Sequence, residues 1–374
     1  MSTSRTTSSV RHLGPNWYAA VMGTAIVASA GRALPVRPPG LTGACEAVWV
    51  LSAAALAVLL VARAAHWARH GDQARRHLGD PAVAPFYGCA AMALLAVGGT
   101  TLSVGAGVIG TDAAVTADAL LWTAGTATGL AAAAGIPYLM VTRHRIEPGQ
   151  ASPVWLLPVV APMVSAALGP ALVPHLPSGQ WRTAMVLACY ALFGMSLLAT
   201  LLILPAVFAR LIHHGPLPLA LTPALFLVLG PLGQSTTAVG NLADAAPGVL
   251  AAPYAHAAAP FAVLYGVPVM GFALLWLALA AAMVLRAFRR GMGFAMTWWA
   301  FTFPVGTCVT GAAALARHTG LQALTWLAVG LYGLLVAAWA VAGARTVHGL
   351  VSGRLLAAPR PVPQQLPSVR VRTT

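Results

Sequence analysis

The sequence predicts an all-α polytopic membrane protein with ten transmembrane helices. Hydrophobic residues make up 59% of the 374 residues and charged residues only 7%, and the mean hydropathy is +0.80. A soluble domain does not have this composition, whereas a chain that crosses a bilayer many times does. The apolar runs are about 18 to 28 residues long, as membrane-spanning helices require, and the alternating strands of a membrane barrel are absent.

The apolar runs divide the chain into one transport domain between two tails. We expect helices at about residues 14–31, 43–65, 83–108, 115–141, 152–174, 181–211, 217–240, 254–286, 292–316 and 321–347. The first run is expected to be a helix, not a cleaved signal peptide, because it lacks a small-residue cleavage site. The domain therefore covers residues 13–348. The Ser/Thr/Arg-rich stretch 1–12 and the Pro/Arg-rich stretch 349–374 are expected to be disordered cytoplasmic tails.

The basic residues indicate the orientation. All 21 are arginines, and with the N-terminus inside the cell 17 of them lie on the cytoplasmic side. Only Arg32, Arg37, Arg182 and Arg317 lie outside. This bias predicts a multi-pass plasma (inner) membrane protein with both termini cytoplasmic. Because the arginines lie in loops and tails, they do not indicate nucleic-acid binding. The four outer arginines either focus anions at a mouth or are simply solvated, and the sequence leaves both open.

A repeat runs through the odd-numbered helices. Trp17, Phe86, Trp155, Phe226 and Trp298 open these helices and follow one another by 69, 69, 71 and 72 residues. Helix breakers follow in each of them: Gly23, then Gly98 with Gly99, Pro162, Pro231 with Gly233, and Pro304 with Gly306. A period near 70 residues predicts five helical hairpins, with the broken helices around a central axis and the smoother ones against lipid. The alternative is that aromatic belts recur at any helix start.

The ninth predicted helix contains the candidate gate. Pro304 and Gly306 interrupt it just after Trp298 and Trp299, and Phe303 lies immediately before the interruption. An exposed backbone group costs several kcal/mol in lipid, so such a break is expected to face a pore or the bundle interior. An aromatic side chain can close a narrow pore. The alternative for Phe303 is ordinary core packing.

Uncharged polar side chains in the seventh helix are candidates for lining a path. Gln234, Ser235 and Thr236 follow Pro231 and Gly233, and such groups either join helices or line a hydrated path. We expect the breakers named above to line the path as well.

The seven acidic residues all fall in loops or near helix ends. A proton-coupled carrier usually keeps an ionisable residue inside the membrane, so their placement favours an anion path. Motifs of metal or aspartyl catalysis are absent. We therefore expect no enzyme activity, no catalytic residue, no metal site and no cofactor.

Three stretches together resemble the tellurite-resistance/dicarboxylate transporter (TDT) family: Pro15–Thr24, Gly230–Gln234 and Trp298–Pro304. That family includes bacterial tellurite-resistance proteins, fungal malate permeases and sulfite exporters, and plant slow anion channels. The resemblance implies ten helices as five hairpins in a quasi-fivefold arrangement around a central pore. In the family a phenylalanine at the position of Phe303 occludes that pore.

The resemblance also implies the partners and the substrate class. Small inorganic or organic anions would pass along the odd-numbered helices, and relatives of the channel type form homotrimers in the lipid bilayer. The residues of Val21–Thr24 and Trp298–Pro304 resemble the malate and sulfite branch more closely than the plant channels. We therefore expect an anion channel or transporter, with a gradient-driven carrier for C4-dicarboxylates or sulfite as the alternative.

Overall fold

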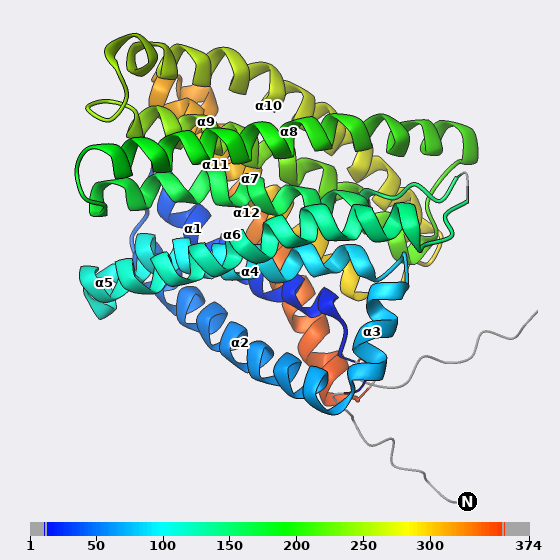
Figure 1. The fold of residues 1–374 in the computed structure, drawn as a ribbon. Coiled ribbons are helices and arrows are strands. Elements are labelled where there is room, and N and C mark those ends of the chain that lie inside the picture. Colours follow the sequence, from blue (N-terminus) through cyan, green and yellow to red (C-terminus); the bar gives the residue numbers. More distant parts are fainter. Residues whose placement is uncertain (1–10, 12, 148, 354, 356–374) are drawn as a thin grey trace, which may run out of the picture.

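The computed structural model describes residues 11, 13–147, 149–353 and 355. All regular secondary structure in these residues is helical, as the sequence predicts (Figure 1). The last helix, α12 (Gln322–Val351), continues three residues into the predicted C-terminal tail. Residues 1–10, 12, 354 and 356–374 of the two predicted tails lie outside the described residues.

Within the described residues, nine helical segments are long and apolar enough to cross a membrane. They are Leu41–Arg69, Ala84–Ile109, Thr111–Thr142, Pro153–His175, Gln180–His214, Leu219–Ala245, Ala252–Arg289, Met296–Thr319 and Gln322–Val351. These segments correspond to the second through tenth predicted helices. The first predicted helix corresponds to a 3-10 turn and α1 (Tyr18–Ala33), which has 16 residues. It is shorter than the roughly 20 residues of a typical span.

Burial separates the helices into an inner and an outer set. The inner set is α1, α4 (Tyr87–Thr100), α7 (Leu156–Leu168), α9 (Leu229–Ala245) and α11 (Phe303–Thr319). The outer set is α2 (Leu41–Arg69), α6 (Thr111–Thr142), α8 (Gln180–His214), α10 (Ala252–Arg289) and α12. The spans that contain α4, α7, α9 and α11 are 67% to 89% buried, whereas the outer spans are only 22% to 33% buried. The outer helices therefore present their apolar side chains to lipid.

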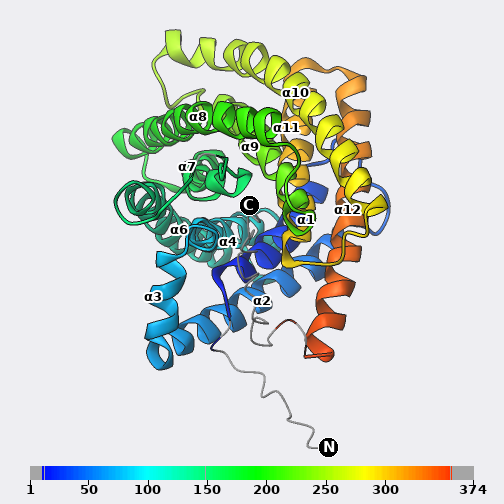
Figure 2. The ribbon, with the colours of Figure 1, turned by 90° about the vertical axis from the view of Figure 1, so that its right-hand side faces the viewer.

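Contacts between helices show five hairpins and a closed inner ring. Each inner helix packs against the outer helix that follows it: α1 on α2, α4 on α6, α7 on α8, α9 on α10, and α11 on α12. The inner helices also pack against one another in order, and α11 returns to α1. Figure 2, which looks roughly along the helices, shows the outer set around the periphery. The predicted hairpins are confirmed.

Every inner helix is preceded by a 3-10 segment, and this is where the five aromatic residues of the repeat lie. The segments are Pro15–Trp17, Ala84–Phe86, Pro153–Trp155, Leu219–Val228 and Met296–Phe301. The first three have a proline in their first two positions, where its missing N–H group costs no hydrogen bond. Each inner helix therefore begins in the same way, with a 3-10 segment that contains one aromatic residue of the repeat.

The helix breaks differ in detail from the predicted ones. The break in the ninth predicted helix is confirmed, but it lies at Thr302, and Pro304 is in the first turn of α11, a position that tolerates proline. Gly23 and Pro162 do not interrupt α1 and α7, so the predicted breaks there are wrong. A π-helical segment, Thr101–Gly105, ends α4 shortly after Gly99. A short helix that the sequence did not predict, α3 (Gly71–Gly79), joins α2 to the next hairpin.

Tryptophans of the outer helices hydrogen-bond to the inner set. The indole N–H of Trp49 in α2 donates to Thr101 Oγ1 at 2.9 Å. The equivalent groups of Trp122 in α6 and Trp276 in α10 donate to the carbonyl oxygens of Ser165 and Leu225, at 3.0 and 2.9 Å. An indole N–H that is buried in apolar surroundings needs such a partner. These bonds fix α2, α6 and α10 in register against the ring.

Candidate functional site

A narrow cavity lies where the five inner helices begin. Two residues three positions apart come from each inner segment: Ala19 and Met22, Phe86 and Cys89, Val154 and Leu157, Ala224 and Leu227, and Thr297 and Ala300, with Met296 beside the last pair. Residues three apart share one face of a helix, so each of the five segments contributes one face to the cavity. The cavity leaves about 20 Å³ for the centres of water molecules, which is room for about one or two waters.

The cavity is lined mainly by apolar groups, but it lies in a positive field. All five inner α-helices start beside it, and each helix N-terminus carries about half a positive charge. In the inner spans, acidic and arginine side chains occur only at the far ends, as Arg32, Asp244 and Arg317. The helix dipoles therefore favour an anion at this end of the axis, and no carboxylate of the inner spans opposes them there.

Phe303 is the first residue of α11 and is 3% exposed. It follows the cavity residue Ala300 by three positions, across the break at Thr302. It does not line the cavity itself. Its neighbour Phe301 packs edge-on against Phe226, with ring centroids 4.9 Å apart. The gate function of Phe303 stays a prediction.

The three polar residues predicted to line the path in α9 are buried. Ser235 and Thr236 donate to the carbonyl oxygen of Leu232 within the same helix, both at 3.0 Å. Gln234 is 3% exposed, and its side-chain Oε1 has no hydrogen-bond partner among the described residues. Gln234 follows the cavity residue Leu227 by seven positions, which is about two helical turns, so it lies on the same face of the helix further along the axis.

The glycines predicted to line the path lie at helix–helix contacts. A Cβ atom built on Gly233 would lie 2.5 Å from the backbone of Cys308, and one on Gly98 would lie 2.6 Å from Asp118 Oδ1. Gly23, Gly99 and Gly306 similarly contact Thr302, Leu168 and Ile26. Small residues let neighbouring backbones approach closely in a membrane. This packing accounts for glycine at these positions. Their lining role, and that of the buried Pro162, Pro231 and Pro304, stays a prediction.

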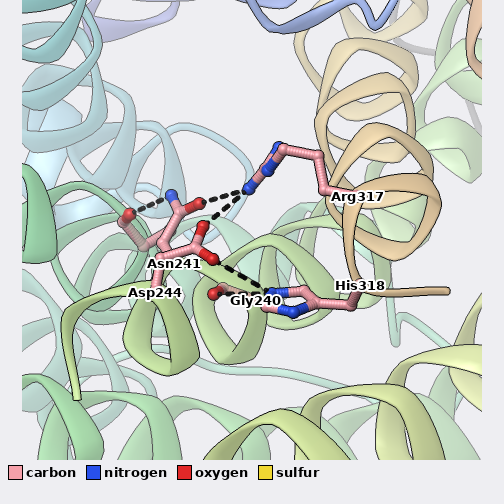
Figure 3. A network of polar contacts seen from close by, with 6 residues as sticks. Gly240, Asn241, Asp244, Arg317 and His318 are labelled. Atoms are coloured by element: carbon pink, nitrogen blue, oxygen red, sulfur yellow. Dashed lines mark hydrogen bonds and ion pairs between the residues drawn. The ribbon is translucent and has the colours of Figure 1, made fainter. Parts of the chain in front are cut away.

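A polar network joins the far ends of three inner helices (Figure 3). Arg317 of α11 donates to Asp244 of α9 at 3.0 Å, and His318 lies 3.3 Å from the other oxygen of the same carboxylate. Asn241 of α9 donates to the carbonyl oxygen of Ala167 in α7 at 2.8 Å. Of the four arginines predicted to lie outside, Arg317 is therefore paired with an acid.

One acidic residue does not fit the expectation that carboxylates avoid the helix interior. Asp118 is the eighth residue of the 32-residue helix α6 and is fully buried. Neither of its carboxylate oxygens has a hydrogen-bond partner in the described part of the chain. The sequence places Asp118 near a helix end, but α6 begins at Thr111, about two turns earlier. A buried carboxyl group without a partner is costly in its charged form.

Comparisons with known proteins all find membrane transport proteins. The family model described as voltage-dependent anion channel (SLAC1) matches residues 12–347. The chain is 26% identical to the uncharacterized transporter MJ0576 of Methanocaldococcus jannaschii over 347 residues, 92% of this chain and 96% of the relative. It is 28% identical to the sulfite efflux pump SSU1 of Arthroderma otae over 348 residues, 91% of each chain. It is also 28% identical to the protein of that name from Trichophyton rubrum over 318 residues, 83% of each.

Proposed function

Because the chain belongs to the voltage-dependent anion channel (SLAC1) family, we propose that it conducts small anions along the axis shared by its five inner helices. The family model describes an anion channel, and the relatives named above are a transporter and sulfite efflux pumps, not enzymes. The observation that carries the proposed path is the cavity to which every inner segment contributes the same pair of positions. Five equivalent faces around one axis are the geometry of a central pore in quasi-fivefold arrangement.

Weak and uncharged contacts provide the selectivity. The N-termini of the inner helices attract an anion to the cavity. Further along, the side-chain amide of Gln234 carries two N–H donors, and its Oε1 accepts no hydrogen bond from the described residues. Such contacts hold an anion without trapping it, as fast passage requires.

Phe303 closes the path in the resting state. It lies one turn beyond the cavity and is buried among the inner helices, and an apolar ring in a narrow bore excludes both ions and water. The test is anion current across a planar bilayer that contains the purified protein. Phe303→Ala is expected to raise the current roughly tenfold or more, because removing the ring removes a barrier above about 1.4 kcal/mol.

Phe301→Ala is the matched control, because Phe301 lies two residues earlier, on the other side of the break at Thr302, and packs against Phe226 and Trp298. A current that rises equally in both variants would refute the gate at Phe303. The reversal potential of the current must also follow the anion gradient and not the cation gradient. Current carried by cations would refute the proposed function.

The proposed orientation places both termini and the start of the inner helices in the cytoplasm, at the plasma (inner) membrane. The distribution of the arginines supports this, since 17 of 21 lie on that side. A reporter fused after Val351 is expected to show a cytoplasmic signal. A signal from the opposite side of the membrane would overturn the orientation.

The second candidate function is a carrier for sulfite or a C4-dicarboxylate, driven by a proton or ion gradient. Two relatives that align with most of the chain are named sulfite efflux pumps. The buried Asp118 also supplies the ionisable group within the membrane that proton coupling needs. Sulfite flux that follows a pH gradient in liposomes, with no current in wild type or Phe303→Ala, would favour this candidate.

A further inference from the structure

An apolar groove lies on the lipid-facing surface between α8 and α10, apart from the axial cavity. Its volume is about 370 Å³, and its lining includes Phe208 and Leu211 of α8, Leu225 of the 3-10 segment before α9, and Trp276, Met283 and Arg286 of α10. The rings of Phe208 and Trp276 meet across it, with centroids 6.3 Å apart. Exposed apolar side chains lie in and beside the groove on both helices, for example Ile212 in its lining and Leu285 next to it.

Arg286 gives the groove a charged rim. It lies in the last turn of α10, is exposed, and is the one charged residue in the lining. Among the described residues, no acidic side chain lies within ion-pair distance of it. Arg289 and Arg290 follow at the same end of the helix. An apolar slot that ends at an unneutralised guanidinium matches a ligand with a long apolar chain and an anionic head.

We propose that this groove binds one anionic phospholipid, with an acyl chain against Trp276 and Met283 and the phosphate on Arg286. A basic pocket between transmembrane helices is a typical site for an anionic lipid head group. The outer helices already face the hydrocarbon, so the chain enters the groove without crossing water.

The floor of the groove is shared with the axial cavity. Leu225 faces the groove, while Ala224 and Leu227 of the same 3-10 segment line the cavity. The indole N–H of Trp276 donates to the carbonyl oxygen of Leu225 at 2.9 Å, which holds the segment between the two. The lipid therefore packs against the other side of a wall of the proposed anion path.

The test is native mass spectrometry of the purified full-length protein, incubated with phosphatidylglycerol or phosphatidylcholine that carry the same acyl chains. Wild type is expected to retain one tightly bound phosphatidylglycerol in preference to phosphatidylcholine. Arg286→Gln is expected to lower that preference about fivefold, since one arginine near an anionic surface contributes about that factor. Arg290→Gln is the control, because Arg290 is exposed at the same end of α10 but does not line the groove.

A second variant tests the acyl chain. Leu279 lines the groove and is 40% exposed, so Leu279→Trp fills the groove without disturbing the core and is expected to abolish tight binding of both lipids. Equal preference in wild type, or an unchanged preference in Arg286→Gln, would overturn the proposal. A dimer mass that disappears in Leu279→Trp would overturn it as well, because a second copy of the chain would then be the occupant. The binding assay involves no transport, so its outcome is independent of the proposed function.

Discussion

The indole N–H of Trp339, in the last helix, donates a hydrogen bond to Thr24 Oγ1, in the first helix, at 3.2 Å. The two residues are 315 positions apart, so this bond joins the two ends of the described bundle. α12 also packs on α1, and α11 packs on both. The contacts of α11 and α12 with α1 therefore close the ring of inner helices, because they join the last hairpin to the first.

Trp339→Phe is expected to destabilise this closure by about 0.5 to 1 kcal/mol, because it removes one partly buried hydrogen bond and keeps most of the ring packing. Thermal unfolding of the purified protein in detergent measures the effect. Trp326→Phe is the control, since Trp326 lies in the same helix and is 61% exposed. If both variants unfold at the same temperature as wild type, the bond does not contribute to closure.

Gly233→Ala is expected to lower the free energy of unfolding by at least about 1 to 3 kcal/mol. The added Cβ atom would lie 2.5 Å from the backbone nitrogen of Cys308, and a helix backbone cannot yield as a flexible side chain does. Gly230→Ala, three residues earlier in α9, is the control, because nothing lies within 4 Å of its Cβ position. The yield of monodisperse protein and its unfolding temperature measure the effect of each of the two substitutions. Wild-type behaviour of Gly233→Ala would contradict the close packing of α9 on α11.

Gln234→Leu is expected to reduce anion flux without reducing the stability of the protein. The buried amide makes no hydrogen bond through Oε1, so its replacement by an apolar side chain of similar size is expected to leave the unfolding temperature unchanged or higher. Anion flux is expected to fall severalfold, because the N–H donors are lost. Flux of chloride and nitrate from loaded liposomes measures this. Ser235→Ala is the control, since the Ser235 hydroxyl is used within its own helix, and equal flux in wild type and Gln234→Leu would remove Gln234 from the path.

Asp118→Asn is expected to raise the unfolding temperature. The carboxyl group is fully buried and has no partner in the described part of the chain, so it must either take up a proton or remain as an unpaired charge, and both destabilise the folded state. The amide has nearly the same size and no charge. Asp112→Asn, an exposed change one turn and a half earlier in the same helix, is expected to have little effect. A lower unfolding temperature for Asp118→Asn would mean that the carboxylate is satisfied in the folded protein.

The sequence alone determined the membrane class, the helices and the hairpins. Composition and the lengths of the apolar runs suffice for this, because the bilayer itself requires apolar helices of about 20 residues. The spacing of Trp17, Phe86, Trp155, Phe226 and Trp298 also located the five inner segments, since each marks a 3-10 entry into the bundle.

Only the tertiary structure decided which side chains share the axis and which join helices. The glycines stood out in the sequence as breakers, but Gly23 lies inside an unbroken helix and contacts Thr302, far along the chain. The cavity residues Ala19, Leu157 and Leu227 gave no signal, because apolar residues look alike in an apolar chain. Asp118 was placed near a helix end, and its burial depends on α4, which packs against α6. In a membrane, the local sequence pattern determines where helices form. The direction in which each side chain points depends on packing between helices that are far apart in the sequence.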